Sequence, residues 1–329
     1  MNFLDKAIQS VENADKILIG PLNWGLGHAS RCIPIIEALL ARNKTIILAS
    51  DGQAAYLLKE TFPDLKLVNL PGYNIHYPYQ SMVLNLLRQS LNIFKAIGEE
   101  NKVVQQIITS EEVDLIISDN RYGVYSSKVK SIFLGHQLQI IHKNPAIAKT
   151  GTFVQKRMIA SFDEIWIPDF PPGNSIAPRL SKICNRKEHQ YIGPISRLKK
   201  CNLPVKRKYL VILSGPEPRR SELEKKLVAL LDGKDYLLVQ GITGKNRNKG
   251  NLVSYLLHNQ LSSEIAQSEI VVCRSGYSSI MDLLILQKKA ILIPTPGQTE
   301  QEYLGTEMQK RYSELFSVIK EEEIGNFHW

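Results

Sequence analysis

The strongest constraint on the fold is a regular alternation of short apolar runs with longer amphipathic stretches. Runs such as 16–22, 45–50 and 113–119 are rich in Ile, Val and Leu and end at Asp, Gly or Pro, which is typical of buried strands. Runs of the same kind follow at 65–72, 130–136, 163–170, 209–215, 235–241, 270–275 and 289–296. Because such strands are apolar on both faces, they predict parallel sheets covered by helices on each side.

The alternation is interrupted once, near residues 191–208, where prolines, a glycine and basic residues replace it. Such a segment disfavours both helix and buried strand and is typical of a linker. A chain of 329 residues has room for two domains. We therefore predict an α/β protein with two Rossmann-like domains whose parallel sheets face each other across a cleft. The N-terminal domain spans 1–195 and the C-terminal domain spans 196–329.

The positive charge of the chain is concentrated in one window. The net charge is +9, and residues 179–208 alone contain ten Lys or Arg against one acid, so the rest of the chain is neutral. This window suits the anionic headgroups of a membrane, and it equally suits a solvated hinge. Neither an aromatic-interleaved basic strand nor a known nucleic-acid motif accompanies it, so we expect no nucleic-acid partner.

The cysteines and the N-terminus indicate the compartment. The four cysteines form neither a CxxC pair nor a zinc spacing with histidine, which disfavours a disulfide framework or a metal site and fits a reducing cytoplasm. The N-terminal residues carry charges where a signal peptide needs apolar residues, and no run of about 18 apolar residues occurs. We expect a cytoplasmic protein that could also bind the inner face of the cell membrane peripherally.

The loop after the first predicted strand, NWGLGHASR, combines two glycines with a histidine. Gly25 and Gly27 allow a tight turn, and the following helix can offer unpaired N–H groups to an anion. His28, at the junction of loop and helix, could act as a general base or bind a substrate hydroxyl or phosphate. A dinucleotide fingerprint is the alternative: Asp51 ends the second strand where a ribose would bind, but Ser30 stands where the third glycine is required.

Two loops of the C-terminal half are candidate phosphate sites. Ser275 is a suitable N-cap, and Gly276 would let a ligand approach the first free N–H groups of the following helix. Asp282 lies about 10 Å further along that helix, so one helix could bind a diphosphate and a ribose. Without a ligand, Ser275 would be only a cap and Asp282 a surface acid. Ser214 and Gly215 form a second such turn after the strand at 209–215.

A polar cluster follows the last predicted strand. A proline and glycine loop leads into a helix expected over 298–316, which opens with Gln298, Glu300 and Gln301. Side chains of this kind can bond several hydroxyls at once, as sugar recognition requires. An ordinary solvated first turn is the alternative, because Glu near a helix N-terminus is favourable without any ligand.

Features of the N-terminal half bear on an acceptor. Asp119 and His136 end predicted strands; a carboxylate at Asp119 could take a proton from an acceptor hydroxyl, or it could cap the next helix. Segment 75–98 mixes aromatic, Met and Leu positions with few charges. It could face an acceptor or a membrane, and core packing is the more common role of such a stripe.

Two of these segments resemble a known family. Residues 23–34, NWGLGHASRCIP, resemble the glycine-rich loop with a terminal histidine of the bacterial peptidoglycan glycosyltransferases that add N-acetylglucosamine to lipid I. Residues 271–305, VVCRSGYSSIMDLLILQKKAILIPTPGQTEQEYLG, resemble the donor-binding signature of that family. The resemblance implies a two-domain GT-B fold and family 28-like transfer from a nucleotide-diphosphate sugar without a catalytic metal. Consistently, no Asp-x-Asp metal motif occurs.

The resemblance also implies that the N-terminal domain, 1–195, binds an acceptor and that the C-terminal domain, 196–329, binds a nucleotide-sugar. It assigns roles to residues as well. Ser275 and Gly276 would face the diphosphate, Asp282 the ribose, and Glu300 and Gln301 the sugar. His28 or Asp119 would deprotonate the acceptor. The donor-binding set expected in full is Gly25, Gly27, Ser214, Gly215, Arg274, Ser275, Gly276, Ser278, Asp282, Gln298, Glu300 and Gln301.

We therefore predict an inverting, metal-independent hexosyltransferase. It would move an N-acetylhexosamine or hexose from a UDP-sugar to a hydroxyl of a lipid-linked or glycan acceptor, with no cofactor besides that substrate. Positive helix ends would stabilise the leaving diphosphate. Two alternatives remain: a sugar-nucleotide 2-epimerase, which needs several carboxylates around the sugar, and a nucleotide-sugar-binding module without catalysis.

Overall fold

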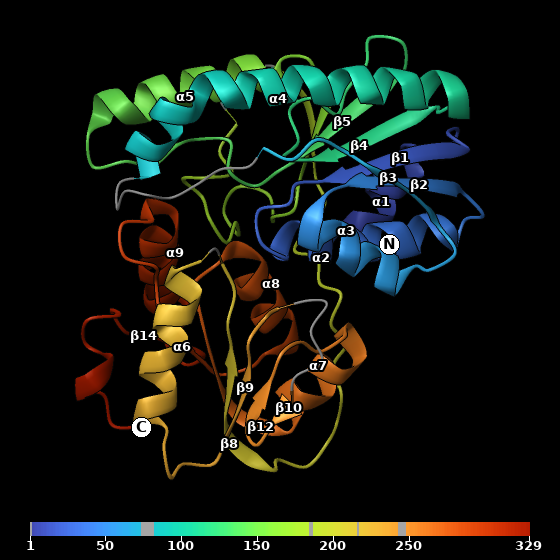
Figure 1. Ribbon diagram of the computed structural model, residues 1–329. Coiled ribbons are helices and arrows are strands. Elements are labelled where there is room, and N and C mark those ends of the chain that lie inside the picture. Colours follow the sequence, from blue (N-terminus) through green and yellow to red (C-terminus); the bar gives the residue numbers. More distant parts are fainter. Residues whose placement is uncertain (1, 74–81, 184–186, 216, 243–247) are drawn as a thin grey trace. The chain divides into compact units, whose positions relative to one another are not determined.

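The computed structural model describes residues 2–73, 82–183, 187–215, 217–242 and 248–329 (Figure 1); of residues 82–87 and 248 it describes the backbone. The chain divides into two units. Unit 1 comprises Met1–Asn23 and Arg31–Ile195, and unit 2 comprises Trp24–Ser30 and Ser196–Trp329. The loop Trp24–Ser30, which we expected in the N-terminal domain, thus groups with unit 2.

Unit 1 is built on a seven-stranded sheet of order β3-β2-β1-β4-β5-β6-β7, in which every neighbouring pair is parallel. Its strands are β1 (Lys16–Pro21), β2 (Thr45–Ser50), β3 (Lys66–Asn69), β4 (Leu115–Asp119), β5 (Lys130–Leu134), β6 (Glu164–Ile167) and β7 (Glu188–Tyr191). Its helices are α1 (Phe3–Gln9), α2 (Gly27–Leu40, which begins in the Trp24–Ser30 loop), α3 (Gly52–Thr61), α4 (Met82–Glu111) and α5 (Pro145–Ile159).

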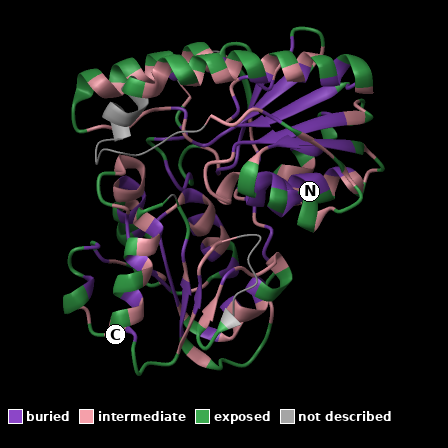
Figure 2. Ribbon diagram, in the orientation of Figure 1, coloured by how far each residue is buried: buried purple, intermediate pink, exposed green. Residues whose placement is uncertain are grey.

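The helices of unit 1 cover both faces of its sheet, as apolar strands require. α4 and α5 lie on one face, and α1, α2 and α3 lie on the other (Figure 1). The α4 face is closed by a buried cluster that joins Val104 and Ile108 to Leu18 and Ile116 of the sheet. Figure 2 shows the strands almost continuously buried, whereas α4 exposes its outer side.

Unit 2 contains a second seven-stranded sheet, of order β10-β11-β9-β8-β12-β13-β14. All neighbouring pairs are parallel except β10 with β11. The strands are β8 (Arg207–Ile212), β9 (Tyr236–Val239), β10 (Asn248–Lys249), β11 (Leu252–Val253), β12 (Ser268–Cys273), β13 (Ala290–Leu292) and β14 (Phe316–Val318). The helices are α6 (Arg219–Leu230), α7 (His258–Ala266), α8 (Tyr277–Leu286), α9 (Thr299–Arg311) and the short 3-10 helix η1 (Ile324–Asn326).

The predicted fold class is confirmed, and each predicted apolar run contains a strand. The prediction was wrong where strands lie at or near the edges of the sheets. β7 has the polar sequence EHQY, and β10 and β11 have two residues each. α9 ends at Arg311, short of the helix expected over 298–316, and β14 begins at Phe316, the last residue of that range. Edge strands have one neighbour and are partly exposed, so they need no continuous apolar run.

A buried ionic network ties the strand ends of unit 1 together. Arg121, just after β4, is fully buried, and it donates to Asp51 Oδ1 at 2.5 Å, to the Pro71 carbonyl at 2.7 Å and to Glu100 Oε1. The hydroxyl of Tyr73 donates to the other oxygen of Glu100 at 2.8 Å. Asp51, the residue on which a dinucleotide site would depend, is therefore paired with an internal arginine.

Arg121→Met should lower the free energy of unfolding of unit 1 by about 3–5 kcal/mol, because it leaves Glu100 as an uncompensated buried charge. Lys66→Met is the control, since it breaks the exposed ion pair between Lys66 and Glu111, whose atoms are 2.7 Å apart. Urea unfolding followed by fluorescence measures both variants. Equal losses in the two would contradict the structural role of the buried network.

Candidate active site

The strand order places one candidate site in each sheet. In an open parallel sheet, ligands bind beyond the carboxyl ends of the strands where the strand order reverses, because the loops on either side lead away in opposite directions. That point lies between β1 and β4 in unit 1 and between β8 and β12 in unit 2. The loops after β8 and β12 carry Ser214, Gly215 and the turn Arg274–Ser278, so topology and motif agree on the site in unit 2.

The turn after β12 differs in detail from the prediction. Gly276, not Ser275, is the N-cap of α8, which begins at Tyr277. Ser275 is fully buried, and its hydroxyl donates to the carbonyl of Gln301 at 2.8 Å. A Cβ placed on Gly276 would meet no atom within 4 Å, so this helix end is open to the close approach of a ligand. The expected cap at Ser275 is thus replaced by a bond between the two halves of the signature.

Arg274 makes internal contacts. Its side chain is 3% exposed, and Nη1 lies 2.7 Å from Glu321 Oε2 and 3.4 Å from the carbonyls of Ile293 and Pro294. Burial lowers the pKa of Arg274 and outweighs the opposing charge of Glu321. These contacts fasten the ends of β12 and β13 to the C-terminal segment, and Arg274 as a donor-binding residue stays a prediction. Within the described residues, Nη2 has no hydrogen-bond partner.

Asp282 lies on α8 as a half-buried carboxylate. Ser196 donates its hydroxyl proton to Asp282 Oδ1. Burial raises the pKa of Asp282 to about 6, against the lowering effects of the Ser196 hydrogen bond and the Arg197 charge. Burial, together with the charge of Asp282, raises the pKa of the nearby Cys273 thiol to about 12. The interpretation of Asp282 as an ordinary surface acid is therefore wrong.

Two side chains in the first turn of α9 accept hydrogen bonds from the loop that precedes this helix. Gln301 Oε1 accepts a hydrogen bond from the backbone N–H of Thr295 at 2.9 Å, and Glu302 accepts one from Gly297 at 3.0 Å. The side-chain oxygen of Gln301 thus braces the loop, and Gln301 as a sugar ligand stays a prediction. Gln298 is the N-cap of α9 without capping it through its side chain, and Gln298 and Glu300 are half-buried.

The glycine loop adopts the expected turn. Gly25 has φ +78°, a conformation that L side chains rarely adopt, and Gly27 begins α2. A Cβ at Gly27 would lie 3.0 Å from Ser278 Oγ, and the Ser278 hydroxyl donates to the Gly27 carbonyl at 3.2 Å, both within unit 2. His28 is half-buried in the first turn of α2, so its position at the junction of loop and helix is confirmed.

Asp119, the second candidate base, is fully buried in an ion pair that the sequence did not reveal. Arg31 Nε donates to Asp119 Oδ2 at 2.5 Å and Nη2 donates to Oδ1, while the Cys32 thiol donates to Oδ2 at 3.6 Å. Arg31 Nη1 also lies 3.1 Å from His136 Nδ1. A guanidinium can only donate, so Nδ1 accepts and the ring proton is on Nε2. Asp119 thus orients Arg31, and its role as the acceptor's base stays a prediction.

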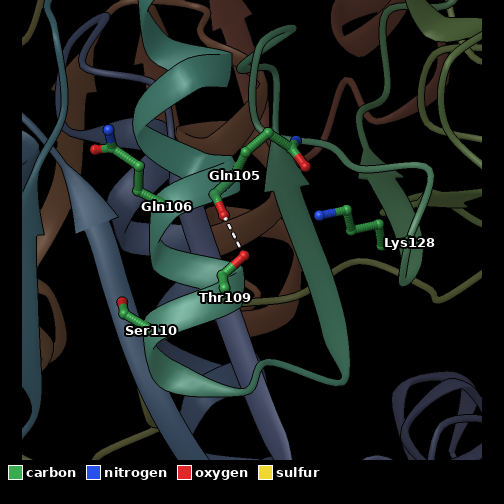
Figure 3. Close-up of a pocket in the computed structure, with 5 residues that line it drawn as sticks. All are labelled: Gln105, Gln106, Thr109, Ser110 and Lys128. Atoms are coloured by element: carbon green, nitrogen blue, oxygen red, sulfur yellow. Dashed lines mark hydrogen bonds between the residues drawn. The ribbon is translucent and has the colours of Figure 1, made fainter.

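Other features of the described ranges bear on metal binding, on the membrane and on the acceptor. No group of three His, Cys, Asp or Glu residues that could hold a metal occurs there, and no helix there is long and apolar enough to cross a membrane. Of segment 75–98, residues 75–81 and the side chains of 82–87 lie outside the described residues. A polar hollow of about 440 Å³ lies on unit 1 beside α4 and contains none of the expected site residues; Gln105, Gln106, Thr109, Ser110 and Lys128 line it (Figure 3).

The chain is similar to known proteins in sequence. Residues 210–321 match the model of the glycosyltransferase family 28 C-terminal domain. An uncharacterized glycosyltransferase of Methanosarcina acetivorans is 24% identical over 323 residues, covering 87% of this chain and 81% of that protein. One from Methanosarcina mazei is 23% identical over 320 residues, with the same coverages.

Solved structures show the same fold at low identity. Arabidopsis thaliana UGT89C1 complexed with quercetin is 12% identical with a TM-score of 0.62, covering 93% of this chain and 85% of that one. Acinetobacter baumannii MurG is 9% identical with a TM-score of 0.55, covering 94% and 86%. The architecture is that of the GT-B proteins. The chain is thus a glycosyltransferase with the GT-B fold, and its residues 210–321 are similar to the family 28 C-terminal domain.

Asp119→Asn should lower the free energy of unfolding by about 3–5 kcal/mol, because it removes the counter-charge of a buried arginine. Asp64→Asn, at an exposed acid, is the control and should change stability little. Thermal unfolding measures both. A stable Asp119→Asn protein that has lost activity would instead restore Asp119 as a catalytic base.

Proposed function

We propose that the protein transfers an N-acetylhexosamine or hexose from a UDP-sugar to a hydroxyl of a lipid-linked or glycan acceptor, with inversion and without a catalytic metal. The observation that carries this proposal is the hydrogen bond from Ser275 to the Gln301 carbonyl at 2.8 Å. This bond joins the turn after β12 to the first turn of α9. β12 is one of the two strands between which the strand order of the sheet reverses. Both halves of the expected donor signature therefore meet in one place.

The donor assignment follows from what each group can offer. The open N-terminus of α8 at Gly276 presents backbone N–H groups and a positive dipole end, which suit a diphosphate. Asp282 can accept hydrogen bonds from ribose hydroxyls when it is ionised. Gln298 and Glu300, in the first turn of α9, are the side chains proposed for the sugar hydroxyls.

His28 is the proposed general base, now that Asp119 is paired with Arg31. The imidazole takes the proton of the acceptor hydroxyl as the acceptor oxygen forms its bond to C1 of the sugar. The bond from C1 to the diphosphate oxygen breaks, and UDP leaves with the electron pair. Helix N-termini stabilise the negative charge that develops on the diphosphate. The relatives are named glycosyltransferases, so neither epimerisation nor binding without catalysis is carried forward.

His28→Ala should reduce transfer by about 10²–10⁴-fold, the usual contribution of a general base, while UDP binding is kept. Single-turnover reactions with a panel of UDP-sugars measure transfer and hydrolysis, and calorimetry with UDP measures donor binding. His142→Ala, at a half-buried histidine outside the proposed site, is the control. If the wild-type protein neither binds nor hydrolyses any nucleotide-sugar, the proposed function is wrong.

A peripheral interaction with an anionic membrane is proposed for residues 199–208. Part of the basic window is engaged internally: Arg197 bonds the Tyr255 hydroxyl at 3.1 Å, and Arg207 pairs with Glu264. The segment between them is open. Leu203 and Val205 are 39% and 61% exposed among the exposed Lys199, Lys200, Lys206 and Lys208. Apolar side chains among lysines suit the headgroup region of an anionic bilayer.

The triple variant Lys199→Gln, Lys200→Gln, Lys206→Gln should weaken binding to phosphatidylglycerol vesicles by at least about ten-fold, because each basic residue near such a surface contributes on the order of 1 kcal/mol. Cosedimentation measures the binding. Lys128→Gln, at the hollow of unit 1, is the control. Equal binding by the triple variant and the wild type would exclude this segment as the membrane contact.

A further inference from the structure

Ser196 is the first residue of the C-terminal part of unit 2, and its hydroxyl is bonded on both sides. It donates to Asp282 Oδ1 and accepts from the backbone N–H of Leu198 at 3.0 Å. A serine hydroxyl has one proton to donate and two lone pairs that accept. Because the N–H of Leu198 bonds a lone pair, the hydroxyl is held with its proton directed at the carboxylate of Asp282. Within the described part of the chain, Asp282 Oδ2 accepts no hydrogen bond that would compete with a ligand hydroxyl.

The segment around Ser196 is firmly held. Arg197 is 8% exposed and donates to the Tyr255 hydroxyl at 3.1 Å, and the N–H of Lys199 donates to Ser262 Oγ at 3.2 Å. The charged and titratable groups that face Asp282 are the Arg197 guanidinium from this segment and the Cys273 thiol from the end of β12. Ser196 therefore reaches Asp282 from a rigid support.

From this geometry we propose that Ser196 is a positioning residue for donor binding: it holds Oδ1 of Asp282 and leaves Oδ2 as the oxygen that accepts from the ribose of a nucleoside diphosphate. The inference rests on the proposed function, which makes Asp282 a donor ligand. Ser196 itself need not touch the donor, since it acts by stabilising the ionised form of the carboxylate.

The pH dependence of donor binding follows from the titration of Asp282. Burial raises the pKa of this carboxyl to about 6, and the Ser196 hydrogen bond opposes that rise. The carboxylate accepts ribose hydroxyls as the ionised form, so affinity is full above this pH and is lost as the pH falls through it. Removing the hydroxyl destabilises the ionised form, so the pKa rises further and affinity is lost at a higher pH.

The test is calorimetric titration of the full chain with UDP across the pH range. Wild-type affinity should fall below about pH 6, and Ser196→Ala should shift this midpoint upward by about one unit, the size expected for losing a hydrogen bond to a charged group. At alkaline pH the two proteins should bind UDP alike.

Two control variants accompany this test. Ser196→Thr keeps a hydroxyl and should restore the wild-type pH profile of UDP binding. Ser263→Ala removes a hydroxyl that bonds the Asn259 carbonyl within α7, and it should leave that profile unchanged. A merely structural defect would weaken binding at every pH.

The outcomes separate this inference from the proposed function. If Asp282→Asn removes the pH dependence while Ser196→Ala leaves it at the wild-type midpoint, Ser196 is not a positioning residue and the donor site stands. If Asp282→Asn binds UDP with the wild-type profile, or UDP binds at no pH, the donor assignment and this inference are both wrong. Carbon NMR measures the pKa of the Asp282 carboxyl in the absence of nucleotide. If this pKa is the same in Ser196→Ala as in the wild type, the inference is wrong.

Discussion

Buried arginines paired with carboxylates hold the carboxyl edges of both sheets. Arg31 with Asp119 and Arg121 with Glu100 lie at the edge of the first sheet, and Arg274 with Glu321 lies at the edge of the second. Parallel strands bring all their following loops to one edge, so polar groups gather there and must be paired when they are buried. Removing one partner of such a pair leaves a buried charge, so each pair constrains the loops that it joins.

This constraint decides which polar groups remain for chemistry. Asp119 and Asp51 end neighbouring strands of the first sheet, yet both are bound to arginines. His28 and Asp282 are half-buried and lie in the first two turns of helices. A burial-raised pKa marks Asp282 as a group whose charge depends on its surroundings, which is common at binding sites. The proposed site thus contains His28 and Asp282, which are not members of these buried pairs.

The fold is specified by pattern more than by particular residues. Solved GT-B structures share this architecture at 9–15% identity, with TM-scores of 0.55–0.62. Apolar strands alternating with amphipathic helices are enough to produce two parallel sheets, because the crossover helices must cover both faces. Many sequences satisfy that pattern, so specificity for donor and acceptor is left to the loops at the carboxyl edges.

The sequence by itself determined the central strands, the positive-φ turn at Gly25 and the positions of His28 and Asp282 on their helices, because these follow from apolar periodicity and local backbone sterics. The tertiary structure alone decided how the polar side chains pair. Arg31 meets Asp119 from 88 positions away, and Ser196 meets Asp282 from 86 positions away. It also bonded Ser275, the expected cap, to the Gln301 carbonyl, and it began β14 at Phe316, the last residue expected in the preceding helix. Such partners depend on strand order and loop packing, and no local pattern of residues records which distant group will arrive beside a given side chain.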